Sequence, residues 1–267
     1  MDLTTVTSLR PARARADLAL APGEVVMGGG SWLFSEPQLE VSGLVDLMDL
    51  GWRSITVTPD GLEIAATCTI AELRAMEAQP TWHAHPLFAQ CCSALLGSFK
   101  VWNVATVGGN ICLALPAGPM TSLASALDAV AVIWTPDGGE REMPVADLVL
   151  DVRTTALAPG EVVRSIRVPQ ASLEATTAFR QIALSALGRS AALVIARRNV
   201  DGTVVLTVTA STTHPVQWRF AALPSGDEVT AAIETHTAWY DDAHGAPDWR
   251  ASITAELARQ VVAELAV

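Results

Sequence analysis

The sequence predicts an α+β fold in three parts: an N-terminal βαβ-like piece, a middle mixed sheet, and a C-terminal antiparallel meander followed by helices. Two observations support this prediction. Short β-branched runs alternate with Pro- and Gly-containing turns up to about Glu174. Beyond that point the strand-like runs follow one another directly, and the chain closes with apolar residues at every fourth position.

The first predicted element after the N-terminal piece is a hairpin. Residues Ser54–Val57 form a β-branched run, Pro59–Gly61 form a turn, and Leu62–Ala66 form the partner strand. Thr69 and Glu72 have the spacing of a capping box, so a helix should begin there.

Two further helices and two strands are expected before residue 170. One helix should open at Pro86 and end at Gly97, with Leu87, Cys91 and Leu95 on one face. Leu123, Ala126, Leu127 and Val130 show helical spacing, while Ala129–Thr135 suggests a buried strand before the turn Pro136–Gly139. Val162–Val168 is a strand stopped by Pro169.

The C-terminal part is predicted as consecutive strands and then helices. The strands are Phe179–Ala183, Ala191–Arg197 and Thr203–Ser211, with a hairpin turn at Asp201–Gly202. The remainder is predicted to be helical, and its last helix carries an apolar stripe formed by Ile253, Leu257, Val261 and Leu265.

Composition narrows the function. The net charge of −11 and the lack of a basic stripe argue against nucleic acid and against an anionic membrane surface as partners. No apolar run reaches the length of a membrane span, and the arginines near the N-terminus are not followed by the apolar core of a secretory signal. We therefore expect a cytoplasmic protein.

The cysteines and histidines do not predict a metal site. Cys68, Cys91, Cys92 and Cys112 lack C-x-x-C spacing, so neither zinc nor an iron–sulfur cluster is indicated. They are expected to act as small buried apolar side chains in a reducing compartment. His83 and His85 lack a third ligand nearby and are expected at the surface or in a loop.

Two glycine-centred loops are the candidate binding site. The first is Met27–Leu33 and the second is Asn103–Ile111. Glycine runs let backbone N–H groups converge on an anion, so two facing loops could hold the two phosphates of a dinucleotide. Either loop alone could be only a tight turn. The first loop is not a Rossmann fingerprint, because Leu33 takes the place of the third glycine, and neither loop has the Lys-Ser/Thr of a P-loop.

With their flanks, these loops resemble the FAD-binding (medium) subunit of molybdenum hydroxylases, the family of carbon monoxide, xanthine and aldehyde dehydrogenases. The resemblance covers nearly the whole chain, and the second loop is similar to the family's Asn-x-Gly-Thr-Ile/Val-Gly-Gly-Asn-Ile. Further similar segments are Leu115–Gly118, Ala126–Ala129, Pro159–Val163 with Val168–Pro169, Arg189, Asp241–Gly245 and Asp248–Arg250.

The resemblance implies an FAD-binding domain of the vanillyl-alcohol-oxidase type at residues 1–172, in subdomains of about 1–58 and 59–172. A C-terminal domain of a short antiparallel sheet with helices follows at 173–267. It implies cofactor contacts from Met27, Gly28, Gly29, Gly30, Ser31, Trp32, Trp102, Ala105, Thr106, Gly108, Gly109, Asn110, Leu113, Pro116 and Val162. Backbone N–H groups of residues 28–31 and 106–110 should hold the diphosphate, and the segment around Val162 should lie near the adenine.

The resemblance also implies a function. In the family this subunit passes electrons from a molybdenum large subunit and an iron–sulfur small subunit through FAD to an acceptor. The flavin does the redox work, so no catalytic acid or base and no metal ligand is assigned to this chain.

The sequence departs from the family pattern where the flavin ring and ribityl chain should lie. Leu113, Leu115 and Pro119 replace polar residues, and Trp102 replaces an arginine. Three interpretations stay open. The chain is an electron-transfer subunit with a divergent pocket, a stand-alone flavoprotein with its own small-molecule substrate, or a non-catalytic relic with weak or no FAD binding.

Overall fold

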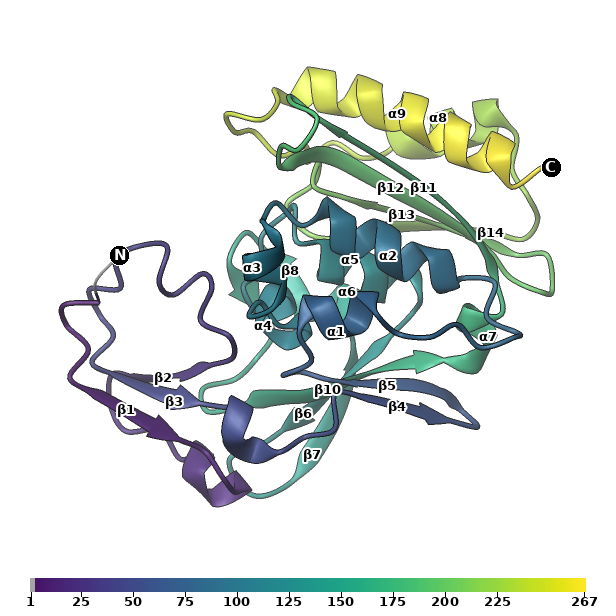
Figure 1. Ribbon diagram of the computed structural model, residues 1–267. Helices are drawn as coiled ribbons and strands as arrows, with labels where there is room; N and C mark the ends of the chain where they lie inside the picture. Colours follow the sequence, from purple (N-terminus) through teal and green to yellow (C-terminus); the bar gives the residue numbers. More distant parts are fainter. Residues whose placement is uncertain (1–2) are drawn as a thin grey trace.

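The computed structural model describes residues 3–267 as a stack of layers (Figure 1). A four-stranded sheet carries two helices on its outer face, and a layer of short helices separates it from a five-stranded sheet. A three-stranded sheet stands beside the five-stranded one. The predicted combination of helices with several sheets is confirmed.

The three-stranded sheet is parallel and lies near the N-terminus. Its strands are β1 (Ser8–Pro11), β2 (Glu24–Met27) and β3 (Gly43–Asp46), in the order β1-β3-β2. The predicted βαβ-like piece is wrong in its helix: the connection from β1 to β2 holds only the 3₁₀ turn η1 (Arg15–Leu18). Pro22, which has a fixed φ and no N–H, and Gly23, with a φ of +80°, close this connection before β2 begins at Glu24.

The five-stranded sheet is antiparallel throughout, not mixed as the sequence suggested. In spatial order its strands are β4 (Ile55–Thr58), β5 (Gly61–Ala65), β10 (Val162–Pro169), β6 (Val130–Trp134) and β7 (Glu140–Pro144). A 3₁₀ turn, η2 (Met48–Leu50), precedes it. The predicted hairpin is confirmed, since Ile55 lies opposite Ile64 in antiparallel register.

The helical layer packs on the five-stranded sheet through α1 (Ile70–Arg74), α2 (His85–Ala94), α3 (Phe99–Trp102), α4 (Val107–Cys112), α5 (Pro119–Ala126), α6 (Val145–Leu148) and α7 (Gln170–Leu173). A small two-stranded sheet, β8 (Val149–Asp151) and β9 (Thr154–Thr155), adjoins α6.

The predicted capping box is confirmed: the Glu72 N–H donates to Thr69 Oγ1 over 3.2 Å, and the Thr69 N–H donates to Glu72 Oε2 over 2.8 Å. Val130 belongs to β6 rather than to α5, because Asp128 adopts a positive φ of 49° that ends the helix.

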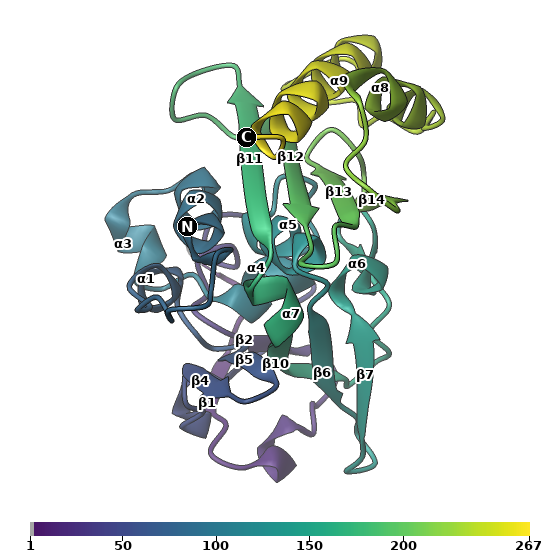
Figure 2. The same cartoon turned by 90° about the vertical axis from the view of Figure 1, so that its right-hand side faces the viewer.

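The C-terminal layer is an antiparallel meander of β11 (Thr176–Ala183), β12 (Ser190–Arg198), β13 (Val204–Thr209) and β14 (Val216–Phe220). Helices α8 (Gly226–Glu234) and α9 (Pro247–Glu264) cover its outer face (Figure 2). The first three strands and the apolar stripe of α9 are confirmed. β14 corrects the prediction that the remainder is helical, since its apolar and polar residues alternate with the period of two of a half-buried strand.

Four further findings concern the predictions from composition. The thiols of Cys68, Cys91 and Cys92 are buried and that of Cys112 is partly buried; burial raises the pKa of Cys68, Cys92 and Cys112 to about 12, so these three remain neutral. His83 is exposed, and the partly buried ring of His85 lies 2.9 Å from the Met76 carbonyl oxygen. Within residues 3–267 no helix is both long and apolar enough to cross a membrane. No cluster of three or more potential metal-binding side chains occurs in the same residues.

One ion pair ties the outer strands of the three-stranded sheet together. The Arg10 guanidinium, on β1, reaches past β3 to the Glu24 carboxylate on β2 with N–O distances of 2.9 and 2.7 Å. These bonds, with a 2.9 Å bond from the Ala21 N–H, hold the pKa of Glu24 at about 2, below its ordinary 4.5.

This lowered pKa predicts a pH-dependent stability. The ionised Glu24 stabilises the fold above its ordinary pKa, and this contribution is lost as the pH falls toward 2. Glu24→Gln should therefore melt at a lower temperature than the unchanged protein at pH 7, and the gap should narrow between pH 4.5 and 2. Thermal unfolding followed by circular dichroism measures it, with Glu40→Gln as the exposed control. A gap that stays constant with pH contradicts the role of the ionised carboxylate.

Candidate functional site

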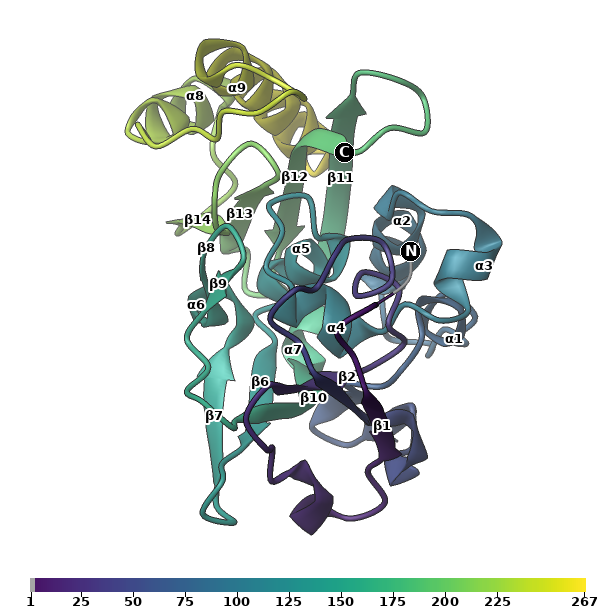
Figure 3. The same ribbon diagram turned by 90° about the vertical axis from the view of Figure 1, so that its left-hand side faces the viewer.

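A cavity of about 590 Å³ lies between the two sheets of the N-terminal half and the helical layer. The loop that follows β2 passes in front of α4 and α5 on this side of the molecule (Figure 3). Both glycine-centred loops line the cavity, so the structure brings together segments that are far apart in the sequence.

The first loop presents a row of free backbone donors. The parallel pairing of β2 with β3 ends at Met27. After it, the N–H groups of Gly28, Gly29, Gly30 and Ser31 have no acceptor anywhere in residues 3–267. Gly30 has a φ of +68°, which turns the chain at the end of this row. Successive free N–H groups in a turn form a concavity that favours anions.

The two loops touch each other through their backbones. A Cβ added to Gly29 would lie 1.4 Å from the Val104 carbonyl oxygen, and one added to Gly28 would lie 2.6 Å from Thr106 Oγ1. Only glycine permits this approach at these positions. The glycines of the first loop are therefore needed for packing as well as for their free donors.

The second loop is fixed to the five-stranded sheet and forms the N-terminus of α4. Its N–H groups are already engaged: Val107 donates to Cys68 O over 2.8 Å, Gly108 to Ala66 O over 2.9 Å, and Gly109 to Thr106 Oγ1 over 3.1 Å. This differs from the expectation that the N–H groups of residues 106–110 hold a diphosphate directly. Within the described chain, only the Thr106 N–H of this set has no acceptor.

Asn110 joins the second loop to the next helix. Its Oδ1 accepts the Met120 N–H over 2.9 Å in the first turn of α5, and its own N–H donates to Thr106 O over 3.0 Å. Its Nδ2 has no acceptor among residues 3–267, and the residue lines the cavity. The Asn110 side chain is thus oriented by one bond and keeps its two Nδ2 hydrogens available.

The predicted site residues separate into two groups. Those that line the cavity are Gly28, Gly29, Gly30, Ser31, Trp32, Ala105, Thr106, Gly108, Gly109, Asn110, Leu113 and Val162. Met27, Trp102 and Pro116 do not line it. Met27 is buried in a small apolar cluster, the Trp102 ring lies under the Arg74 guanidinium at 4.9 Å, and the Pro116 carbonyl accepts the Ala210 N–H over 2.8 Å.

The lining has two apolar parts. The sheet side consists of Val25, Val26, Leu47, Val162 and Val163, and the helix side consists of Ala94, Leu95, Leu96, Val101, Leu113 and Leu115. Most of these residues could not be assigned to the site from the sequence, because isolated valines and leucines carry no motif. Arg189 also lines the cavity; its match to the family's arginine was the only sequence signal for it.

Glu161 is the carboxylate of the lining, and it is already paired. The Arg141 Nη2 lies 2.6 Å from its Oε2, and the Ala158 N–H donates to the same oxygen over 2.8 Å. These bonds lower the pKa of Glu161, so it is ionised and held in place. It is therefore a fixed structural charge rather than a proton donor.

Two indole N–H groups near the site lack acceptors. Trp32 Nε1 and Trp102 Nε1 are buried without a hydrogen-bond partner in residues 3–267. An unsatisfied buried donor costs about 1–3 kcal/mol. Trp32 lines the cavity, so an acceptor brought by a ligand could relieve this cost there.

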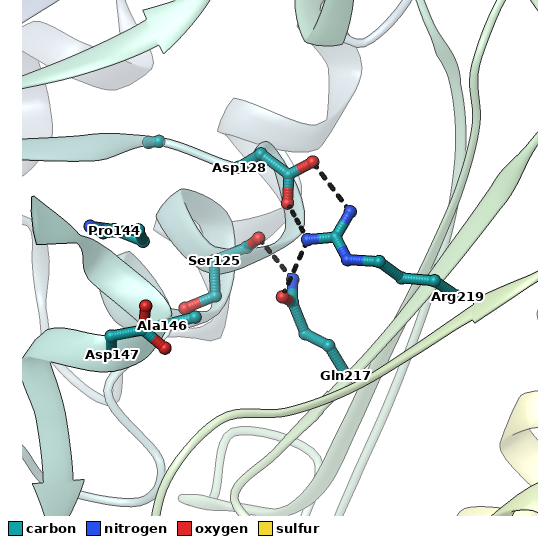
Figure 4. A pocket seen from close by; sticks show the side chains of 8 residues that line it. Ser125, Asp128, Pro144, Ala146, Asp147, Gln217 and Arg219 are labelled. Atoms are coloured by element: carbon teal, nitrogen blue, oxygen red, sulfur yellow. Dashed lines mark hydrogen bonds and ion pairs between the residues drawn. The ribbon is translucent and has the colours of Figure 1, made fainter.

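A second cavity, of about 550 Å³, lies between α5, α6 and β14 (Figure 4). Asp128 accepts bonds from Arg219, at 2.8 and 3.1 Å, and from the buried Arg197. Burial alone would raise the pKa of Asp128, but the bonds from Arg219 and Arg197 outweigh it and lower the pKa. Gln217 Nε2 donates to the Ser125 carbonyl over 2.7 Å. These polar groups satisfy each other across the junction, which marks a structural joint between the helical layer and the C-terminal sheet.

The sequence of this chain is similar to those of known oxidoreductases. Residues 10–171 match the family described as the FAD binding domain in molybdopterin dehydrogenase. A xanthine dehydrogenase of Oryza sativa subsp. japonica is 29% identical over 123 residues, which are 44% of this chain and 9% of that protein. Xanthine dehydrogenase 1 of Arabidopsis thaliana is 26% identical over 136 residues, or 48% of this chain and 10% of that protein. The chain thus matches about a tenth of the length of these relatives.

Solved structures show the same fold over nearly the whole chain. A chain of reconstituted CO dehydrogenase from Oligotropha carboxidovorans superposes with a TM-score of 0.86 and 21% identity, covering 98% of both chains. A chain of quinoline 2-oxidoreductase from Pseudomonas putida 86 superposes with a TM-score of 0.82 and 20% identity, covering 99% of this chain and 98% of that one.

The contact between the loops predicts a steric requirement at Gly29. Gly29→Ala places a methyl group on the Val104 carbonyl and should reduce the free energy of unfolding by about 1–3 kcal/mol, as overpacking does. Gly226→Ala is the matched control, because its Cβ would meet only the Arg259 side chain at 3.5 Å. Urea unfolding of the two variants compares them. Equal stability of the variants contradicts the close approach.

Proposed function

The chain belongs to the family of FAD-binding domains in molybdopterin dehydrogenases, with FAD as cofactor, and from this premise we propose that it is the electron-transferring flavin subunit of a molybdenum hydroxylase. Electrons would reach its FAD from a molybdenum large subunit through an iron–sulfur small subunit and leave to an acceptor. The observation that carries the proposal is the row of free N–H groups at Gly28–Ser31, facing a cavity that the second glycine loop closes.

The residues present fit the diphosphate of FAD. Four free N–H groups from the first loop, the Thr106 N–H and the Asn110 amide can donate to phosphate oxygens. A Cβ at Gly109 would meet nothing but Thr106 Oγ1 at 2.8 Å, and Gly109 lines the cavity. The absent side chain at Gly109 therefore leaves room for a phosphate beside the N-terminus of α4.

The two apolar sides of the cavity fit the two ring systems. The sheet side, with Val162 as the resemblance implies, would hold the adenine, and the helix side would hold the isoalloxazine. Leucines at positions 95, 96, 113 and 115 would surround the ring, and they would offer no side-chain hydrogen bonds to its carbonyls. FAD supplies the redox chemistry when bound, so these residues need only bind and orient it.

Exposed apolar side chains beside the helix side support the subunit interpretation. Leu96 lines the cavity and is 56% exposed, and Phe99 on the neighbouring α3 is 68% exposed. Val104, in the second glycine loop, is also exposed. Apolar groups gathered at a cavity mouth are typical of surfaces that dock a partner. The partners proposed are the molybdenum and iron–sulfur subunits.

A stand-alone flavoprotein acting on its own small molecule is the second candidate. The leucines of the helix side favour it, because an apolar substrate could share that space with the ring. The two candidates differ in whether FAD bound to the isolated chain is reduced by a small molecule alone or only through partner subunits.

We also infer the subdomain arrangement. The three-stranded sheet and the five-stranded sheet would correspond to the two subdomains of a vanillyl-alcohol-oxidase-type FAD domain, at about residues 1–58 and 59–172. The cavity between these two sheets supports this assignment. The C-terminal layer would form the separate domain of residues 173–267.

FAD binding at the glycine loops is tested with a charge placed beside the phosphates. The purified protein should be yellow and release FAD on denaturation. Gly109→Asp should lose FAD binding by at least a hundredfold while keeping its circular dichroism spectrum, because its Cβ displaces only the Thr106 hydroxyl, 2.8 Å away, whereas its carboxylate would stand against phosphates. Gly109→Ala is the control for size without charge. Retained flavin in Gly109→Asp rules out this location.

The subunit role is tested separately by co-expression with a molybdenum subunit and an iron–sulfur subunit of this family. We expect a stable three-subunit complex whose organic substrate reduces the FAD of this chain, whereas the FAD-loaded chain alone stays oxidised. Reduction of the isolated chain by a small molecule favours the stand-alone enzyme.

A further inference from the structure

Arg189 is the single arginine or lysine in the cavity lining among the described residues. It lies in the connection between β11 and β12, immediately before β12 begins at Ser190. The rest of the lining comes from residues 25–163. The C-terminal layer therefore contributes one side chain to the cavity, and that side chain is a cation.

The Arg189 guanidinium has no hydrogen-bond or ion-pair partner in residues 3–267, although the residue is partly buried. Its neighbours on the same sheet are all engaged. Arg180 pairs with Glu264 at 2.7 Å, Arg197 pairs with Asp128, and Arg198 donates to the Leu265 carbonyl over 3.2 Å. Arg189 is thus left without a partner on a sheet where other arginines find one.

The surroundings amplify this charge. The helix side of the same cavity consists of leucines, valine and alanine, and the one carboxylate of the lining, Glu161, is already paired with Arg141. Because Arg189 is partly buried, solvent and salt screen its charge less than they screen that of a fully exposed arginine. Among residues 3–267, the lining of this cavity holds no unpaired carboxylate that could offset Arg189.

We propose that Arg189 sets the reduction potential of the bound flavin by stabilising the negative charge that the isoalloxazine gains on reduction. This inference rests on the proposed function, which places the ring on the helix side. Two electrons and one proton convert oxidised FAD to its reduced form with a net gain of one negative charge. A guanidinium in the same cavity as the ring would stabilise the reduced form more than the oxidised one. Arg189 is then a positioning and electrostatic residue with no role as proton donor, since arginine stays charged.

The test measures the midpoint potential of FAD bound to the purified full-length chain, by reduction against a reference dye. Arg189→Gln should bind reduced FAD at least tenfold more weakly relative to oxidised FAD, which for a two-electron couple is a potential lower by about 30 mV. Arg189→Lys keeps the charge and should retain most of the potential. Arg180→Gln removes one charge from the same sheet outside the cavity and should leave the potential unchanged.

The affinity for oxidised FAD is measured by fluorescence titration. Together with the midpoint potential, it gives the affinity for reduced FAD. An unchanged potential in Arg189→Gln overturns this inference while leaving FAD binding intact. A loss of affinity for oxidised FAD as large as the loss for reduced FAD also overturns it, because Arg189 would then be a simple binding residue. If the unchanged chain binds no FAD at all, both the proposed function and this inference fail.

Discussion

The close approach of two backbone loops determines how this chain can hold a dinucleotide. Gly29 lies so near the Val104 carbonyl that any side chain would displace one loop from the other. The second loop cannot yield easily, because the Val107 and Gly108 N–H groups are bonded to the carbonyls of Cys68 and Ala66, at the end of β5. The first loop is therefore placed by contact with a rigid partner, and its own N–H groups remain free.

The difference between the first loop, whose N–H groups are free, and the second loop, whose N–H groups are bonded, could be predicted from the sequence only in part. The Thr69–Glu72 cap and the hairpin of β4 and β5 are local signals, and both are confirmed in the structure. Whether a given N–H is free depends on tertiary neighbours: the bond from Gly108 to Ala66 joins residues whose proximity no local pattern encodes. The same limit explains why β14, with its Trp218 packed beneath α8 and α9, was assigned to a helical region.

The apolar helix side of the cavity follows from substitutions that are visible in the sequence, but its consequence depends on the structure. Leu113 and Leu115 line the cavity as expected from their positions, whereas Trp102 lies outside it against Arg74. Family members with an arginine at the position of Trp102 would have a positive charge near the flavin ring, and this chain lacks that arginine. In this chain the charge in the lining comes from Arg189 instead, which belongs to a different layer of the fold.

The position of Arg189 in turn depends on a buried cation elsewhere. The Arg250 side chain is 1% exposed and donates to the carbonyls of Ala191 and Gly245, over 2.8 and 2.9 Å, while it pairs with Asp242. Ala191 is the second residue of β12, so Arg250 fixes the strand start from which Arg189 extends. The same guanidinium donates to the Ala210 carbonyl, and the Ala210 N–H donates to Pro116 O, the residue after Leu115. A single buried arginine therefore holds two walls of the cavity, one apolar and one cationic. Because an unpaired buried charge is costly, this network constrains both walls to one arrangement.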